Sequence, residues 1–256
     1  MMAPEAAGVC RVADKAVPSR TVMTDERVQA WQALILSGRW FQTIPETLRS
    51  RLLAAAVPRR LVPGQRLFSR GDRPCGLYCV VEGAIRISGV SESGKEALLM
   101  LMEPPHWFGE ISLVDGQPRT HDAVAEGATV VLQVPQAALE TMLADEPRYW
   151  RDFALLMSHK LRLMFIALEE LSLLPAPARL ARRLLMIAEG YGNLREGARR
   201  VIDVSQEQLA QMLAISRQTT NQILKELEAQ GIVRLAYGKI ELLDLERLRD
   251  AARLTP

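Results

Sequence analysis

The longest regular pattern of apolar positions in this chain lies between Pro147 and Leu174. It repeats at steps of three and four residues, like the seam of a coiled coil, and no Gly or Pro interrupts it between Arg148 and Leu174. At ~1.5 Å per residue, the pattern predicts one helix roughly 40 Å long. The seam consists of Trp150, Ala154, Met157, Leu161, Met164, Leu168 and Leu171. Because this length exceeds what a compact domain needs, we expect one side to meet a copy of itself. The alternative is a core helix of one large domain.

A second apolar set on the same helix leaves few polar positions in its C-terminal half. Its members are Phe153, Leu156, Leu163 and residues 165–167. A helix that is apolar nearly all round is buried on several sides. We therefore expect another side of the helix to pack on the preceding domain.

The pattern changes to short β-rich runs between Leu61 and Val134, with turn signals such as Pro63-Gly64 and Glu82-Gly83 between them. The predicted strands are 66–69, 77–81, 84–88, 97–101 and 129–134. Strands at this regular spacing predict a small antiparallel barrel or roll. Helices are expected at 26–37, 45–56 and 135–143, and residues 1 to about 25 are expected to be disordered.

The C-terminal part predicts two helices joined by a tight turn. Ser205 and Gln208 form a capping box for a helix that runs through Leu213, and Ser216 is the N-cap of a second helix, 217–229. An earlier helix is expected at 178–188. The segments 232–235 and 239–243 predict a β-hairpin.

The outer face of the second helix carries side chains that can recognise bases. Arg217, Gln218, Asn221 and Gln222 share this face, whereas Ile215, Thr220, Ile223 and Leu224 are expected to face inward. Arg pairs with guanine, and Gln or Asn with adenine, in the major groove. The sequence thus favours a helix-turn-helix with the hairpin as a wing that contacts phosphates. The alternative is an ordinary helical hairpin with a solvated polar face.

Composition narrows the class of protein without deciding it. The 256 residues carry a net charge of +2, but from Pro175 onward 13 Lys/Arg face 10 Asp/Glu, which permits nucleic-acid binding. The odd number of cysteines, Cys10, Cys75 and Cys79, fits a reducing cytoplasm. We expect no membrane span, no metal site and no catalytic residues, because none of the corresponding patterns is present.

A second functional motif comprises residues 108–113 and 116–120. Gly109 would let the backbone approach a ligand, Arg119 beside Thr120 suits a phosphate, and Glu110 could accept from ribose hydroxyls. On physical grounds alone, two hairpin turns with a surface Arg explain the same residues.

The order of β-roll, Phe-Gly-Glu-Ile-Ser-Leu with Pro-Arg-Thr, long helix and winged helix-turn-helix resembles the cAMP receptor protein/FNR family of bacterial transcription regulators, over roughly residues 40–245. The resemblance implies an α+β fold: a cyclic-nucleotide-binding β-roll (a double-stranded β-helix or jelly roll) at 26–146, a dimerisation helix at 147–174 and a winged helix-turn-helix at 175–256.

The resemblance also implies roles for particular residues. The effector set is Gly109, Glu110, Ile111, Ser112, Arg119, Thr120, Met164 and Phe165. The DNA-binding set is Ser205, Ser216, Arg217, Gln218, Thr219, Asn221, Gln222, Lys225 and Lys239. The dimer set is Trp150, Met157, Leu161, Met164, Leu168 and Leu171. The implied partners are double-stranded DNA, a second copy of the chain and RNA polymerase, and the implied effector is a cyclic nucleotide such as cAMP.

Several positions depart from the family pattern. Met164 and Phe165 replace the hydroxyl side chains that cAMP-responsive members offer to adenine, His121 replaces a small residue, and Ala214 replaces the glycine of the helix-turn-helix. The effector site could therefore be vestigial, or take another ligand such as cyclic di-GMP. A third hypothesis is a cyclic-nucleotide-binding regulatory subunit of an enzyme.

Overall fold

A computed structural model describes residues 25–92, 94, 96–193, 198–236 and 238–253. Cys10 and the predicted disordered segment up to residue 24 lie outside the described residues. The described chain divides into two compact units. The first contains residues up to Gly89 together with Met102–Met157, and the second contains Val90–Leu101 together with the residues from Ser158 onward.

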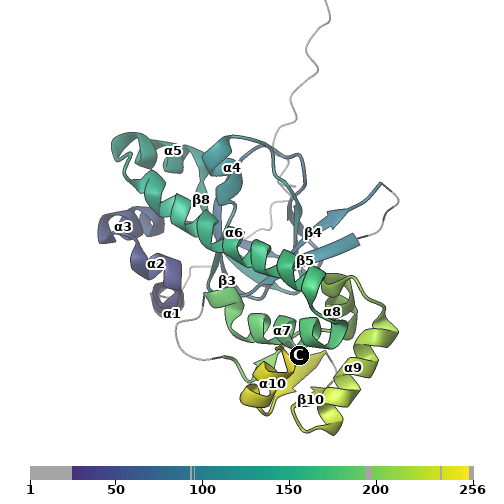
Figure 1. The fold of residues 1–256 in the computed structure, drawn as a ribbon. Helices are drawn as coiled ribbons and strands as arrows, with labels where there is room; N and C mark the ends of the chain where they lie inside the picture. Colours follow the sequence, from purple (N-terminus) through teal and green to yellow (C-terminus); the bar gives the residue numbers. More distant parts are fainter. Residues whose placement is uncertain (1–24, 93, 95, 194–197, 237, 254–256) are drawn as a thin grey trace, which may run out of the picture. The chain divides into compact units, whose positions relative to one another are not determined.

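Two four-stranded antiparallel sheets form the β-roll (Figure 1). One has the order β1-β8-β3-β6 and the other β2-β7-β4-β5. The strands are β1 Val57–Leu61, β2 Arg66–Phe68, β3 Gly76–Glu82, β4 Ile85–Val90, β5 Glu96–Met102, β6 His106–Phe108, β7 Asp122–Ala125 and β8 Thr129–Pro135. The predicted roll and its five predicted strands are confirmed. β1 was missed because it is an exposed edge strand of polar composition, and β6 and β7 because they are short.

Among the described residues, five helices accompany the sheets, namely α1 Asp25–Ser37, α2 Arg39–Thr43, α3 Glu46–Ala55, α4 Glu110–Asp115 and α5 Gln136–Asp145. The core of this unit contains an aromatic cluster, in which Phe41 stacks on Trp107 at 5.4 Å and Trp40 lies 5.9 Å from Phe153. The Trp40 indole N–H also donates to the backbone carbonyl of Asp152 at 2.8 Å. The beginning of the long helix is thereby fixed to the core of the roll.

The long helix α6, Tyr149–Leu173, is continuous (Figure 1) and confirms the helix predicted from the seam. Tyr149, Phe153 and Leu156 are buried in the core of the roll. Phe153 and Leu156 belong to the second apolar set, so their predicted packing on the preceding domain is confirmed. In the single chain, the C-terminal half of α6 leaves many apolar side chains exposed, and their burial against a second copy stays a prediction. The exposed apolar residues of α6 are Trp150, Leu155, Leu161, Met164, Phe165, Ile166, Leu168, Leu171 and Leu173.

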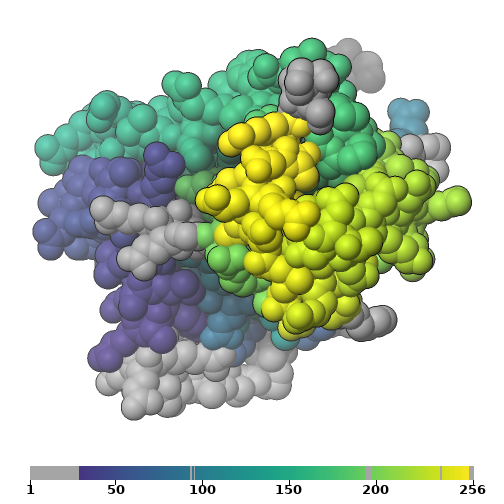
Figure 2. Space-filling model, turned by 60° about the horizontal axis from the view of Figure 1, so that its bottom comes forward, coloured from purple at the N-terminus to yellow at the C-terminus, as the bar shows by residue number. Residues whose placement is uncertain are grey.

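The second unit contains the winged helix-turn-helix. Its elements are α7 Ala176–Ala188, the 3-10 turn η1 Gly190–Gly192, β9 Val201–Ile202, α8 Gln206–Leu213, α9 Arg217–Ala229, β10 Val233–Ala236, β11 Lys239–Leu242 and α10 Leu245–Ala251. The wing is a sheet of order β10-β11-β9. Helix α10, which the sequence analysis did not predict, is capped by Asp244 and buries Leu248 in the core of this unit. Figure 2 shows the part from α9 to α10 as a continuous packed surface in yellow-green to yellow.

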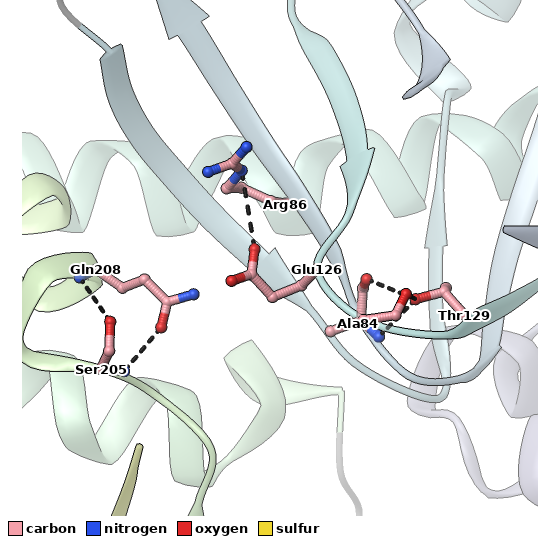
Figure 3. A network of polar contacts seen from close by, with 7 residues as sticks. Ala84, Arg86, Glu126, Thr129, Ser205 and Gln208 are labelled. Atoms are coloured by element: carbon pink, nitrogen blue, oxygen red, sulfur yellow. Dashed lines mark hydrogen bonds and ion pairs between the residues drawn. The ribbon is translucent and has the colours of Figure 1, made fainter. Parts of the chain in front are cut away.

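Polar contacts hold the turns of both units (Figure 3). In the roll, the Thr129 hydroxyl bridges the Ala84 backbone, and Arg86 pairs with Glu126 at 3.8 Å. In the second unit, Ser205 Oγ accepts from Gln208 N at 3.2 Å, and Gln208 Oε1 accepts from Ser205 N at 2.7 Å. The predicted capping box is therefore confirmed. No helix in the described part of the chain is long and apolar enough to cross a membrane.

The turn between α8 and α9 contains a strained backbone position. Ala214 adopts the left-handed conformation, with φ 53° and ψ 39°. A side chain in this region costs roughly 1–2 kcal/mol, whereas glycine adopts it freely. Ala214, which replaces the glycine of the family's helix-turn-helix, therefore has a strained backbone.

We predict that Ala214→Gly stabilises the winged helix-turn-helix by about 0.5–1 kcal/mol, because the relief of left-handed strain exceeds the extra chain entropy of glycine in the unfolded state. Thermal unfolding followed by far-UV circular dichroism measures the effect. The matched control is Ala210→Gly inside α8, which should destabilise by about 1 kcal/mol from helix propensity. A loss of stability in both variants would contradict the strain at Ala214.

Candidate effector site and nucleic-acid interface

The effector motif is built around a short helix with glycine at both ends. β6 ends at the buried Phe108, Gly109 is the N-cap of α4 with φ 100°, and Gly116 is its C-cap with φ 67°. A Cβ atom on Gly109 would lie 2.9 Å from Arg119 Nη1 and 2.9 Å from the Gly76 carbonyl oxygen, whereas one on Gly116 would meet nothing within 4 Å. Gly109 is thus required for both its conformation and the space that the Arg119 guanidinium occupies.

The Arg119 side chain is buried, with only 4% of its surface exposed. Nη1 donates to the Gly109 carbonyl at 2.9 Å, and Nη2 donates to the Gly76 carbonyl at 2.6 Å. The guanidinium also lies 4.5 Å from the centre of the Phe68 ring. Among the described residues, its buried Nε has no hydrogen-bond partner. The guanidinium therefore has a buried N–H donor that makes no hydrogen bond within the described chain.

The backbone around Arg119 is fixed by the turn between β2 and β3. Arg119 N donates to the Asp72 carbonyl, and the Arg119 carbonyl accepts from Gly71 N, both at 2.8 Å. Arg70 N donates to Asp122 Oδ1 at 2.7 Å. These bonds hold residues 119–122 against the turn of residues 70–72.

The other predicted effector residues of the roll occupy different environments. Glu110 and Ser112 are buried, with 2% of each residue exposed, whereas Ile111 is 42% exposed. Thr120 is exposed, and its Oγ1 lies 2.9 Å from His121 Nδ1. The structure brings Gly109 and Arg119 into contact, while Ile111 and Thr120 present their side chains to solvent.

The remaining two members of the effector set lie on α6. Met164 is 54% exposed and Phe165 is 63% exposed, and both belong to the second unit. Their side chains offer apolar contact and stacking but no hydroxyl group. Any base that meets them would gain packing without hydrogen bonds.

Helix α9 presents a polar face above a buried one. Thr220, Ile223 and Leu224 are buried, as predicted, and Ile215 packs partly on the same core. Ser216 caps the helix by accepting from Thr219 N at 3.0 Å. The solvent-facing residues of the predicted DNA-binding set here are Ser216, Arg217, Gln218, Thr219, Gln222 and Lys225, while Asn221 is half-buried. Two amides and a guanidinium therefore share one open helix face.

Several predicted DNA-binding residues already have partners inside the protein, including Gln222, whose Nε2 donates to Glu226 Oε1 at 3.2 Å. Lys239, in the wing, pairs with Asp203 at 3.2 Å, and both side chains are more than half exposed. Ser205 Oγ is the acceptor of the capping box, which leaves only its hydroxyl proton to donate. An exposed ion pair contributes little stability, so Lys239 can exchange Asp203 for a phosphate at small cost.

Sequence reasoning missed the groups that surround Arg119. Phe68 and Tyr78 place their rings under the guanidinium, at 4.5 and 5.7 Å, and Cys75 Sγ accepts from Nη2 at 3.4 Å. No local signal in the sequence links these residues to Arg119, because they lie more than 40 positions away. In the described chain, no group of three or more His, Cys, Asp or Glu side chains gathers as a metal site would require.

Two family models match this chain. Residues 58–146 match the cyclic nucleotide-binding domain, and residues 178–251 match the Crp-like helix-turn-helix domain. Together with the fold, these matches define a DNA-binding regulator that carries a nucleotide-binding β-roll.

Similar proteins identify the family. The CRP-like cAMP-activated global transcriptional regulator of Mycobacterium tuberculosis is 32% identical over 205 residues, which cover 78% of this chain and 92% of the relative. The cyclic AMP receptor protein of Thermus thermophilus is 31% identical over 195 residues, which cover 76% and 88%. A crystal structure of a CRP/FNR-family regulator from Thermus thermophilus has a TM-score of 0.61 at 28% identity and covers 77% of this chain and 98% of that one. The chain belongs to the cAMP receptor protein/FNR family, whose members here are transcription regulators and not enzymes.

We predict that Gly109→Ala destabilises the roll by about 2–3 kcal/mol, because it adds a strained φ and a contact with Arg119. All four tryptophans of the chain, Trp31, Trp40, Trp107 and Trp150, lie in the first unit, so denaturant unfolding followed by tryptophan fluorescence reports on the roll.

Gly116→Ala is the matched control for Gly109→Ala, since it has a positive φ but open space around its Cβ. It should cost only about 1 kcal/mol. Equal losses in the two variants would show that the guanidinium does not need the space at Gly109.

Proposed function

We propose that this protein is a dimeric transcription regulator whose affinity for a near-palindromic DNA site is controlled by a cyclic nucleotide bound in the β-roll. The observation that carries the effector site is Arg119, a buried guanidinium whose Nε lacks a partner among the described residues. A buried donor left unsatisfied costs about 1–3 kcal/mol, and the phosphate of a ligand would supply the missing acceptor.

In this proposal the effector set divides into two halves. Gly109, Glu110, Ile111 and Ser112 line the ribose and phosphate, and Arg119 with Thr120 holds the phosphate. Met164 and Phe165 face the base. The two relatives described above are a cAMP-activated regulator and a cyclic AMP receptor protein, which favours cAMP as the effector class.

The base half of the site argues for modest cAMP affinity. Met164 and Phe165 cannot accept from the adenine amino group, and leaving that group buried without a partner costs about 1–3 kcal/mol. The loss corresponds to roughly one to two decades in affinity. A nucleotide with another base or a second phosphate, such as cyclic di-GMP, would avoid the penalty and is the second candidate effector.

Dimerisation is supported by the exposed seam of α6. Leu161, Leu168 and Leu171 are each more than half exposed in the single chain. Aligned leucines at steps of three and four residues on an exposed face are typical of a helix that packs on its copy. The proposed interface also includes Trp150, Met157 and Met164.

The DNA contacts divide into base recognition and phosphate binding. Arg217, Gln218, Asn221 and Gln222 would recognise base edges, since amide and guanidinium groups pair doubly with adenine and guanine. Phosphate contacts are assigned to Ser205, Ser216, Thr219, Lys225 and Lys239. Such a regulator would work in the cytoplasm and would contact RNA polymerase.

We predict that replacing Leu161 and Leu168 together with Glu dissociates the dimer and abolishes tight binding to a palindromic site, because charge is placed in the apolar seam. Two recognition helices one duplex turn apart, about 34 Å, are needed to occupy both half-sites. Sedimentation measures the mass, and fluorescence anisotropy measures binding to a site selected from random DNA.

Arg162→Glu is the control for this pair, because it changes the net charge by the same −2 at an exposed polar position of the same helix. It should leave the dimer intact. A double variant that is monomeric yet binds the full palindrome as tightly as the parent would contradict the proposal.

We predict that cAMP binds modestly to the parent and about tenfold more tightly or better after Met164→Thr with Phe165→Ser, because the new hydroxyls can pair with the adenine. Calorimetry with cAMP gives the affinity, and DNA binding with and without cAMP gives the coupling. Ile166→Thr, which adds a hydroxyl to a neighbouring exposed position, should change neither. Tight cAMP binding by the parent, with strong DNA activation and no gain from the double change, would be inconsistent with this assignment.

A further inference from the structure

The position after the Arg-Thr pair carries a histidine whose ring contacts the threonine. His121 Nδ1 lies 2.9 Å from Thr120 Oγ1, and His121 is half-buried while Thr120 is exposed. The two residues follow Arg119 and lie directly before β7, which begins at Asp122. The hydroxyl that the proposed function assigns to the phosphate is therefore already engaged by an imidazole.

The direction of this hydrogen bond depends on the tautomer of the neutral ring and on whether the ring is protonated. In a neutral imidazole with a bare Nδ1, the Thr120 hydroxyl donates its proton to the ring and offers only lone pairs outward. In the imidazolium both nitrogens carry protons, so Nδ1–H donates to Oγ1. The hydroxyl proton is then free to point at an anion.

We propose that His121 is a positioning residue of the phosphate site: its protonated form turns the Thr120 hydroxyl into a donor toward the phosphate and adds a positive charge beside it. Binding of the effector therefore takes up a proton at His121. This inference rests on the proposed function, because it assigns a role within the same site.

The charges around the ring favour the neutral form in the free protein. Partial burial, followed by the cation of Arg70, lowers the pKa of His121, and Asp122 opposes them by raising it. Asp122 is itself 3.7 Å from Arg66 and accepts from Arg70 N, so its charge is shared. β4 contributes the uncharged Gly89, where a Cβ would lie 3.6 Å from His121 Cδ2.

A bound phosphate favours the protonated form of His121 instead. An anion within a few ångströms raises the pKa of a histidine by about one unit or more. The complex then binds more protons than the free protein, so affinity rises as the pH falls. A cyclic phosphodiester carries the same charge throughout the range in which histidine titrates, so the ligand contributes no proton of its own.

The test is calorimetric titration of the full-length protein with cAMP and with cyclic di-GMP, between pH 5.5 and 8, in two buffers of different ionisation enthalpy. Whichever nucleotide binds should bind up to about tenfold more tightly at the acidic end, with fractional proton uptake visible as a buffer-dependent heat. The His121→Asn variant keeps an N–H donor for Thr120 but has no titrating group. It should therefore bind the nucleotide at every pH without taking up a proton.

The chain has three histidines, which provides a matched control. His159→Gln changes a histidine that bonds to the Tyr191 carbonyl in the other unit and should retain the full pH dependence. Binding without proton uptake in the parent, or uptake that persists in His121→Asn, overturns this inference and leaves the proposed function standing. Absence of binding by either nucleotide at every pH overturns both.

Discussion

The burial of one guanidinium constrains the architecture of the β-roll. A buried guanidinium such as that of Arg119 requires hydrogen-bond acceptors and ring faces in place of water. The fold supplies the carbonyls of Gly76 and Gly109 and the face of Phe68. The guanidinium has space beside Gly109 because Gly109 lacks a Cβ, whereas a Cβ on Gly76 would clash with the backbone of Val134. Gly109, the ring of Phe68 and the turn at residues 70–72 thus all contact or fix Arg119.

The long helix meets a different constraint, because its two halves face different environments. Its first turns bury Tyr149, Phe153 and Leu156 in the roll, whereas its later turns expose leucines and Phe165. Near its end, burial raises the pKa of Glu170, which Arg182 of α7 partly compensates from 3.2 Å. The later turns of the helix leave an apolar stripe exposed in the single chain, which extends to Leu171 and Leu173. In the proposed function a second copy covers this leucine seam.

Local patterns predicted much of this molecule. Capping residues fixed the bounds of α8 and α9, and alternating apolar runs located five strands, because both signals lie within a few residues. The family could be recognised from two short motifs. The surroundings of Arg119 could not be predicted, since Phe68, Cys75 and Tyr78 approach it only after the sheets form. Helix α4 was missed because a six-residue helix between two glycines reads as a pair of turns.

Effector binding and dimerisation are linked through α6 in the proposed function. Met164 belongs to both proposed sets, and its neighbours Leu161 and Leu168 lie one turn away on the same exposed stripe. If a base packs on Met164 and Phe165, it changes the apolar surface that the second copy meets. Thermodynamic linkage then requires a reciprocal effect. Dimerisation changes the affinity for the effector by the same factor by which the effector changes the affinity of one copy for the other. Replacing hydroxyl side chains by apolar ones at this point strengthens the helix seam and weakens the hydrogen bonds to a base. In the proposed function, Met164 therefore contributes more to helix pairing than to hydrogen bonding with a base.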